Sequence, residues 1–206
     1  REGHQITAEQ LIICGNAYLG NVSPKKLRRR MAPVTSSVMA TEPLNDSEIK
    51  ASIPSKAAIA DGNTALNYFR IDKQNRMIFG GRASYLNKDP TNVEADLKKR
   101  MNAVFPNLKN KKILQAWSGR IGITLNRLPD FGRISDTAIY VQGYSGHGVA
   151  FSGVAGNILS DAVTGKNERF NQLTKIHHLP FPGGPMRTPV LALGMSWFKL
   201  RDYFKI

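Results

Sequence analysis

In the first part of the chain, short hydrophobic runs alternate with short polar runs, and this pattern predicts extended segments. Residues 5–14, QITAEQLIIC, predict a short strand, a turn and a second strand that ends at the small-residue corner GNA, residues 15–17. The stretch 32–41, APVTSSVMAT, is rich in valine and threonine, which favours a strand. In residues 64–82 two apolar runs flank the polar turn DKQN, which predicts a hairpin.

A helical pattern follows the hairpin. Asp89 is a suitable N-cap, and Pro90 fits the first helical position after it. The spacing predicts a helix that ends at Phe105-Pro106. Its apolar face comprises Val93, Leu97, Met101 and Val104.

The second half of the chain continues with extended segments and one apolar helix. Residues 111–124 predict a strand, and 132–134 with 139–142 predict a strand pair. The helix expected after Gly148 is apolar on nearly all sides, which predicts that it is buried. In the remainder, 166–206, PFPGGPMRTP is expected as a rigid extended loop and WFKLRDYF as a short amphipathic helix.

This order of strands, an exposed helix, more strands and a buried helix favours an α+β fold or an interrupted α/β design. With 206 residues the chain is long enough for one large domain or two small ones. It contains no apolar run near the roughly 20 residues of a membrane-spanning helix. It begins REGHQIT, without an initiator methionine or a signal-peptide pattern, so we expect it to be a piece of a longer protein.

The net charge of +14 makes nucleic-acid binding a serious alternative. The basic segments PKKLRRR, LKKR and KNKK are short and separated, however, and no nucleic-acid-binding motif accompanies them. A solvated basic face is therefore the preferred interpretation. The single cysteine, Cys14, cannot form an internal disulfide, which agrees with a reducing compartment, and we expect a cytoplasmic location.

Motifs of hydrolytic and metal chemistry are absent from the sequence. There is no GxxxxGK[ST], HExxH, CxxC or GxSxG, and the four histidines show no metal-ligand spacing, so no metal is expected. Acidic residues are few and scattered, and no catalytic residue is assigned.

The strongest local motif is the glycine-rich stretch that precedes the apolar helix. It would place free backbone N–H groups and the positive end of a helix dipole at one point, which attracts an anion or a developing negative charge. A turn that only packs the helix on a sheet is an equally good explanation of the motif alone. The stretch comprises Gly143, Tyr144, Ser145, Gly146, His147, Gly148 and Val149.

Arg120 is the second candidate, because it lies between glycines in an apolar strand where an unpaired guanidinium would be costly. A carboxylate-bearing ligand or an internal acidic residue would both serve as its partner. Arg127 and Asp130 are expected to pair with each other at a surface turn.

Taken together, AWSGRIGITLNRLPDFGRI, YVQGYSGHGVAFSGVAGNILSDAVTG and PFPGGPMRTPVLALGMSWFKLRD resemble the C-terminal half of FAD-dependent amine oxidoreductases of the D-amino-acid oxidase, glycine oxidase and sarcosine oxidase family. The tail is most similar to the gamma-glutamylputrescine oxidoreductase branch. ITAEQLIICGNAYL, ATEPL and NRMIFGGR are similar to strands of the family's FAD-binding and substrate domains.

The resemblance implies an α+β arrangement in which a mixed, largely antiparallel substrate-domain sheet joins the C-terminal remnant of a Rossmann-like FAD-binding domain. The implied boundaries are 1–31 for the end of the FAD-binding domain, 32–124 for the substrate-binding domain, 125–165 for the return to the FAD-binding domain, and 166–206 for a tail that packs on the core.

In the family, the helix after the glycine turn points its N-terminus at the pyrimidine edge of the flavin, so the resemblance implies that residues 143–149 bind FAD. Arg120 matches an arginine that meets the substrate carboxylate in some relatives. Sarcosine-oxidase relatives attach flavin to a cysteine near the position of Gly119. Because this chain has glycine there and Cys14 is far away in sequence, we expect non-covalent FAD.

The family's N-terminal GxGxxG, which binds the pyrophosphate of FAD, does not occur in the 206 residues. The resemblance therefore implies a C-terminal portion that needs an N-terminal FAD-binding half, uses an amine and dioxygen, and is inactive alone. A basic nucleic-acid-binding module and an inactive structural fragment are the alternatives.

Overall fold

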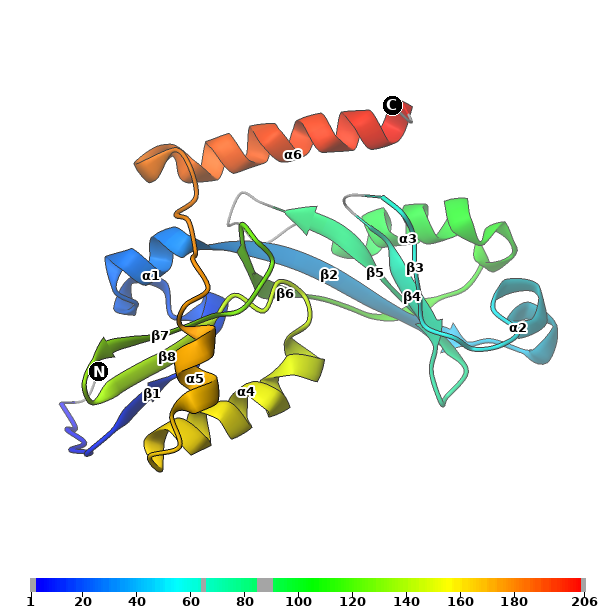
Figure 1. Ribbon diagram of the computed structural model, residues 1–206. Coiled ribbons are helices and arrows are strands. Elements are labelled where there is room, and N and C mark those ends of the chain that lie inside the picture. Colours follow the sequence, from blue (N-terminus) through cyan, green and yellow to red (C-terminus); the bar gives the residue numbers. More distant parts are fainter. Residues whose placement is uncertain (1–2, 64–65, 85–90, 205–206) are drawn as a thin grey trace. The chain divides into compact units, whose positions relative to one another are not determined.

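The computed structural model describes the chain over residues 3–63, 66–84 and 91–204. The chain divides into two compact units (Figure 1). Unit 1 is formed by residues 1–33 and 121–184, and unit 2 by residues 34–120 and 185–206. No helix of the described residues has the length and apolar character needed to cross a membrane.

Unit 1 contains one small sheet with helices around it. Its elements are β1 (Leu11–Ile13), η1 (Asn16–Tyr18), η2 (Gly20–Val22), α1 (Lys25–Arg30), β7 (Asp130–Ser135), β8 (Ala138–Gln142), α4 (Gly148–Val163) and α5 (Glu168–Leu173), together with the first residues of β2 (Met31–Pro43) and the last of β6 (Ile113–Thr124).

The sheet of unit 1 has the order β1-β8-β7, in which β1 runs parallel to β8 and β7 antiparallel to it. Every residue of the central strand β8 is buried. Because side chains alternate along a strand, Ile139 and Val141 share one face. That face packs on α4 and α5 in a core completed by Phe131, Ala155, Ile158, Leu159, Ala162 and Phe170.

Unit 2 contains a five-stranded sheet, on which two helices pack. The remaining elements are α2 (Asp46–Ser52), β3 (Ile59–Ala60), β4 (Tyr68–Ile71), β5 (Arg76–Ser84), α3 (Val93–Val104), η3 (Pro106–Leu108) and α6 (Arg187–Phe204), and η4 (Gly184–Met186) precedes α6. The sheet order is β3-β4-β5-β2-β6.

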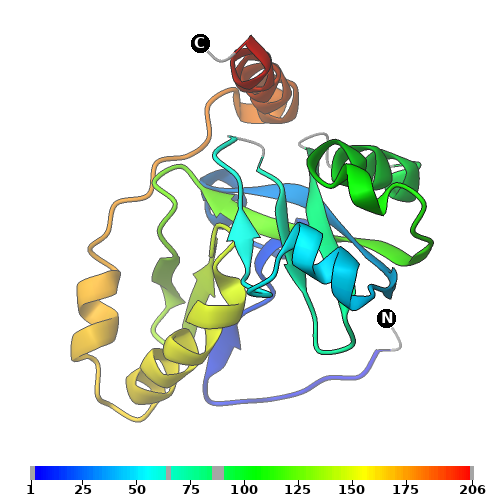
Figure 2. The same ribbon diagram turned by 90° about the vertical axis from the view of Figure 1, so that its right-hand side faces the viewer.

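The core of unit 2 joins this sheet to α2 and α3, the cyan and green helices of Figure 2. Phe79 stacks on Phe69 with ring centroids 5.5 Å apart, and Phe105 meets Phe69 edge-on at 5.0 Å. Leu97 and Met101 of α3 are fully buried against them. The predicted strand over 32–41, the hairpin and the apolar face of α3 are thus confirmed, although Val104 at the end of α3 is exposed.

Two predictions about chain segments are wrong. Residues 5–10 form no strand, because pairing with β8 begins only at Leu11. The tail is more helical than expected. Helix α6 starts at Arg187, inside the segment 180–189 that was predicted as an extended loop. The predicted cap at Asp89 and Pro90 lies outside the described residues, and the described part of α3 starts at Val93.

The prediction that α4 is buried holds for one face of the helix and is wrong for the other. Only the face with Ala155, Ile158, Leu159 and Ala162 packs on the sheet. On the other side Val149 is 100% exposed, and Val154 is about half exposed. A Cβ atom added at Gly153 or Gly156 would meet no atom within 4 Å. An apolar helix with this much open surface has room for a further partner.

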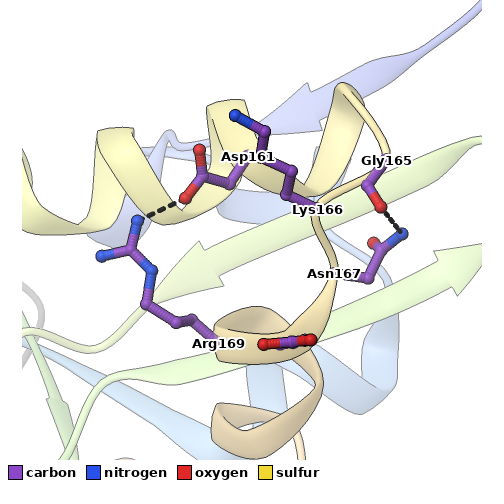
Figure 3. A pocket seen from close by; sticks show the side chains of 6 residues that line it. Asp161, Gly165, Lys166, Asn167 and Arg169 are labelled. Atoms are coloured by element: carbon purple, nitrogen blue, oxygen red, sulfur yellow. Dashed lines mark hydrogen bonds and ion pairs between the residues drawn. The ribbon is translucent and has the colours of Figure 1, made fainter.

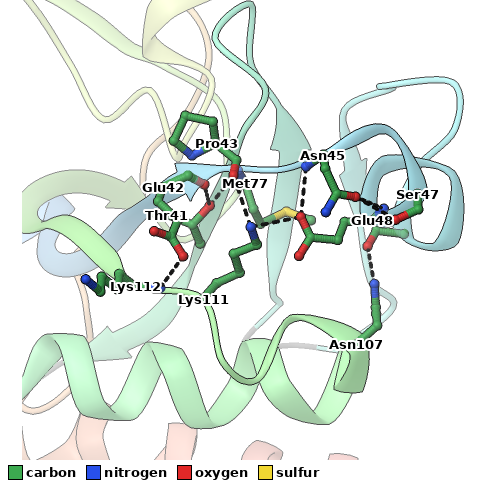
Figure 4. A network of polar contacts seen from close by, with 11 residues as sticks. Thr41, Glu42, Pro43, Asn45, Ser47, Glu48, Met77, Asn107, Lys111 and Lys112 are labelled. Atoms are coloured by element: carbon green, nitrogen blue, oxygen red, sulfur yellow. Dashed lines mark hydrogen bonds and ion pairs between the residues drawn. The ribbon is translucent and has the colours of Figure 1, made fainter.

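The start of α2 is stabilised by a reciprocal capping box at the centre of a polar network (Figure 4). The Asn45 side chain accepts a hydrogen bond from the Glu48 amide at 2.9 Å, and the Glu48 carboxylate accepts one from the Asn45 amide at 2.8 Å. Lys111 lies 2.8 Å from the same carboxylate and donates to the Pro43 carbonyl at 3.1 Å. The loop before β6 is thereby tied to both ends of the β2–α2 connection.

Replacing Asn45 with alanine removes the acceptor of this box, and we expect a loss of about 1 kcal/mol in the free energy of unfolding. Asn45→Asp keeps an acceptor and should stay within a few tenths of wild type. Urea titrations followed by tryptophan fluorescence would measure both, because Trp117 and Trp197 both belong to unit 2. Equal losses for the two variants would contradict a capping role.

Candidate functional site: the glycine loop and the start of helix α4

The predicted glycine-rich motif forms the loop between β8 and α4. Gly143 and Gly146 have φ angles of +76° and +98°, in the region that side-chain-bearing residues rarely adopt. Ser145 between them also has a positive φ, of +52°. The loop therefore turns sharply twice before α4 begins at Gly148.

The first half of the loop is tightly held by the end of β6. The Ser145 amide donates to the Gly122 carbonyl at 2.8 Å, and Tyr144 forms an isolated antiparallel bridge with Ile123. The Thr124 amide donates to the Ser145 hydroxyl oxygen at 3.3 Å, and that hydroxyl donates to the Gly143 carbonyl at 3.1 Å. These bonds account for the left-handed conformation of Ser145.

The second half of the loop leaves its backbone donors open. His147 occupies the N-cap position of α4 without a side-chain capping bond. Within the described residues, no recorded acceptor takes a hydrogen bond from the N–H groups of Gly148, Val149 or Ala150. Such groups, with the helix dipole, carry about half a positive charge at the start of a helix.

The space beside these donors is open. A Cβ atom at Gly146 would meet nothing within 4 Å, and His147 and Val149 are exposed. A flat ligand with an electron-rich edge thus has access to the amides. The donor set therefore suits a ring that carries or acquires negative charge, which is the property of the pyrimidine edge of a flavin that was expected from the sequence.

A buried polar cluster lies at the base of the loop, where β8 ends. Asp130, fully buried, accepts hydrogen bonds from the Tyr140 hydroxyl at 3.1 Å and from the Gln142 amide at 3.0 Å. Arg30 lies 3.7 Å from the carboxylate, and Gln142 also donates to the Leu27 carbonyl at 3.1 Å. The cluster connects α1, the start of β7 and the end of β8 directly before Gly143.

The partner of Asp130 differs from the expected one. Asp130 pairs with Arg30 in the interior instead of with Arg127 at a surface turn. Arg127 is exposed and has a φ of +63°. Burial and the neighbouring Asp130 carboxylate raise the pKa of Tyr140, which keeps its hydroxyl protonated as a hydrogen-bond donor.

His178 completes the interior side of this cluster. It is buried, and within the described residues neither ring nitrogen lies in good hydrogen-bond geometry with a partner. Burial lowers the pKa of His178 below its ordinary value of 6.5, and the charges of Arg30 and His177 act in the same direction. The Asp130 carboxylate and the Pro129 carbonyl oppose the shift without cancelling it.

Unit 1 should therefore lose stability as the pH falls below about 6.5. The unfolded histidine binds a proton at that pH, whereas the buried ring resists protonation, so acid favours the unfolded chain by about 1.4 kcal/mol for each pH unit of difference between the two pKa values. His178→Gln should flatten the dependence between pH 7 and 5, and the exposed His147→Gln in the same unit is the matched control. Unfolding measured by circular dichroism at several pH values tests this, and an unchanged slope in His178→Gln would contradict it.

Cys14 lies at the end of β1, next to the glycine loop. Partial burial raises the pKa of its thiol, so it is protonated at neutral pH. Burial and this neighbouring cysteine also raise the pKa of Tyr144. A protonated thiol is a poor nucleophile, which agrees with the expectation of a non-covalent cofactor.

Arg120 is half-buried on β6 and is the last residue of the first segment of unit 2. The seven loop residues, in contrast, all belong to unit 1. Residues 143–149 thus lie together in one loop and the start of α4, and both their cofactor role and a substrate role for Arg120 stay predictions.

A separate hollow of about 450 Å³ lies at the opposite end of α4 (Figure 3). An ion pair between Asp161 and Arg169 spans it, and Asn167 donates to the Gly165 carbonyl at 3.3 Å. The lining residues come from the end of α4, the connection after it and the start of α5, and the charged ones among them include both signs. Because a 16-residue helix is about 24 Å long, this hollow is remote from the glycine loop.

Three further positions that hold the loop were not singled out from the sequence. Asn16 accepts a hydrogen bond from the Gly143 amide at 2.9 Å, and Gly122 and Thr124 hold Ser145. The only available signal was the Gly-Asn pair after β1, since asparagine is the side-chain-bearing residue that most often takes a positive φ.

Comparison with known proteins identifies the family. Residues 1–162 match the family described as FAD dependent oxidoreductase (DAO). The chain belongs to this family. Its members depend on FAD, and the expected α+β fold and flavoprotein resemblance are confirmed.

Curated members of the family are similar over nearly the whole chain. Gamma-glutamylputrescine oxidoreductase of Escherichia coli is 38% identical over 199 residues, which are 96% of this chain and 47% of that protein. A probable oxidoreductase, OrdL, of Haemophilus influenzae is 34% identical over 205 residues, 97% and 46% of the respective chains. The chain thus spans about half the length of the curated relatives it matches.

Solved structures of oxidases share the fold. Glycine oxidase from Geobacillus kaustophilus superposes with a TM-score of 0.69 at 16% identity, over 86% of this chain and 48% of that one. Iminodiacetate oxidase from Chelativorans gives a TM-score of 0.65 at 15% identity, over 82% and 47%. At this identity the likeness concerns the fold.

Proposed function

We propose that this chain is the C-terminal half of an FAD-dependent oxidoreductase that oxidises an amine C–N bond. The observation that carries the proposal is the open start of α4, where the N–H groups of Gly148, Val149 and Ala150 have no acceptor among the described residues. The family match favours this function over a basic nucleic-acid-binding module.

In this proposal residues 143–149 bind the flavin ring non-covalently. The N–H groups at the start of α4 donate to its electron-rich edge, and Gly146 lets the ring approach the backbone. When bound, FAD supplies the chemistry: it accepts a hydride from the amine, dioxygen takes the electrons to give hydrogen peroxide, and water hydrolyses the imine product to a carbonyl compound.

The pyrophosphate of FAD requires residues outside this chain, which we assign to an N-terminal half. The exposed face of α4 and the open edge of β1 belong to the surface that this half would cover. The relatives of about twice the length agree with this arrangement. The chain alone would then be inactive, and a cytoplasmic location is part of the proposal.

For the substrate we propose gamma-glutamylputrescine, since the curated relative with that activity is 38% identical over nearly the whole chain. Arg120 is proposed to contact the substrate. Because a glycine oxidase shares the fold, glycine is the alternative substrate against which gamma-glutamylputrescine should be compared.

The test compares the 206-residue chain with a longer polypeptide that includes the residues encoded upstream of Arg1. The longer polypeptide should purify with one FAD that is released on denaturation, and gamma-glutamylputrescine should bleach its flavin absorbance without oxygen. Glycine should bleach it more slowly, and the 206-residue chain should bind little FAD.

Purification of the longer polypeptide without flavin, and without binding of added FAD, would overturn the proposal. Bleaching by glycine but not by gamma-glutamylputrescine would overturn only the substrate assignment. Arg120→Lys keeps the charge and is the matched control for Arg120→Ala, which should raise KM for the substrate more than it changes kcat.

A further inference from the structure

Asn16 lies at a point where three segments of unit 1 meet. It follows β1 as the first residue of η1, and its Oδ1 atom accepts the Gly143 N–H at 2.9 Å across 127 positions of sequence. A Cβ atom added at Gly122 would lie 2.3 Å from the same Oδ1. The Asn16 amide is thus fitted between the end of β6 and the first residue of the glycine loop.

The backbone conformation of Asn16 favours asparagine at this position. Its φ angle is +46°, in the left-handed region that asparagine tolerates better than most side-chain-bearing residues. This conformation belongs to the turn that follows β1. Glycine would also adopt it but would supply no acceptor for the Gly143 amide.

Beyond the contact of Asn16 with Gly143, further hydrogen bonds hold the consecutive residues of the loop as far as the first turn of α4. Gly143 accepts from the Ser145 hydroxyl, Tyr144 accepts from the His147 amide at 2.9 Å, and His147 accepts from Phe151 in the first turn of α4. A shift of Gly143 would therefore move the start of the helix. The donors of Gly148 to Ala150 lie at that start.

We propose that Asn16 is a positioning residue that holds Gly143 and through it directs the open N–H groups at the start of α4 toward their ligand. The assignment of that ligand as the flavin ring rests on the proposed function. The positioning itself is a property of the chain alone, so the two are tested separately.

The first experiment measures amide hydrogen exchange of Gly143 by NMR in the 206-residue chain. In Asn16→Gly, which keeps the left-handed turn and removes the acceptor, exchange should be about tenfold faster. In Asn16→Asp, which keeps an acceptor oxygen, it should stay within about twofold of wild type. Exchange of the β8 amides in the same samples is the internal control and should not change.

Equal exchange of Gly143 in wild type and Asn16→Gly would overturn the proposal. If Asn16→Gly does not fold but Asn16→Asp does, the need for the acceptor is supported. Failure of both variants to fold would overturn a specific positioning role, because the residue would then be required for the fold as a whole.

The second experiment uses the longer, FAD-loaded polypeptide. Asn16→Gly should weaken FAD binding about tenfold. Asn16→Asp should make the flavin midpoint potential more negative, since it adds a negative charge beside a site that stabilises the reduced ring. An unchanged potential and FAD affinity in both variants would overturn the link to the ligand. A wild-type polypeptide without flavin would overturn the proposed function and leave the exchange result valid.

Discussion

Replacing Asp130 with alanine is expected to destabilise unit 1 by about 3 to 5 kcal/mol. The substitution leaves the Tyr140 hydroxyl without its acceptor, removes one of two acceptors from the Gln142 amide, and deprives Arg30 of its counter-charge. All three groups contact the carboxylate inside the protein, where water replaces lost bonds poorly.

Both tryptophans, Trp117 and Trp197, belong to unit 2, so their fluorescence does not report directly on this loss. Hydrogen exchange of the β8 amides in increasing urea measures it in unit 1. Asp130→Asn keeps one acceptor oxygen and should lose about 1 to 3 kcal/mol. The exposed Asp136→Ala is the control and should stay within about 0.5 kcal/mol. A loss below 1 kcal/mol in Asp130→Ala would show that the cluster is energetically unimportant.

Gly143→Ala is expected to cost about 2 to 4 kcal/mol, the sum of a strained positive φ and an overpacked contact. The new Cβ would lie 2.4 Å from the Thr124 Cγ2 methyl. That side chain is not free to turn away, because its hydroxyl donates to the Leu128 carbonyl at 2.7 Å. Gly146→Ala has the same kind of strained φ with open space around it, and should cost only about 1 kcal/mol.

A double-mutant cycle separates the two causes. Thr124→Ser removes the methyl group and keeps the hydroxyl, so it should restore about 1 to 2 kcal/mol to Gly143→Ala. Lack of any rescue would assign the whole cost to the backbone. In the FAD-loaded polypeptide, a bulky residue at Gly146 should displace or perturb the flavin although it barely affects the chain alone. An unchanged flavin spectrum and turnover would contradict the proposed approach of the ring.

Features of this structure could be predicted from the sequence where they depend on residues that are close together along the chain. The hairpin around residues 72–75 and the strand at 32–41 follow from local patterns of apolar and turn residues, and both are present. The glycine loop was also recognised, because the run of glycines that permits the positive φ angles of Gly143 and Gly146 is a local feature of the sequence.

Features that depend on remote partners could not be predicted in this way. Asn16 meets Gly143 only after the chain has folded, and Asp130 finds Arg30 on another element instead of the nearby Arg127. The exposure of Val149 illustrates the same difficulty: hydrophobicity predicts burial but does not specify the surface that provides it.

The three-residue length of β1 has a practical consequence. An edge strand exposes backbone groups to which another chain can add, and the partly exposed Leu11 and Ile12 make this addition more favourable. Short edge strands limit this association because they offer few bonds. Extending β1 toward its N-terminus, by threonine or valine substitutions at residues 8–10, should therefore make the isolated chain aggregate at lower concentrations.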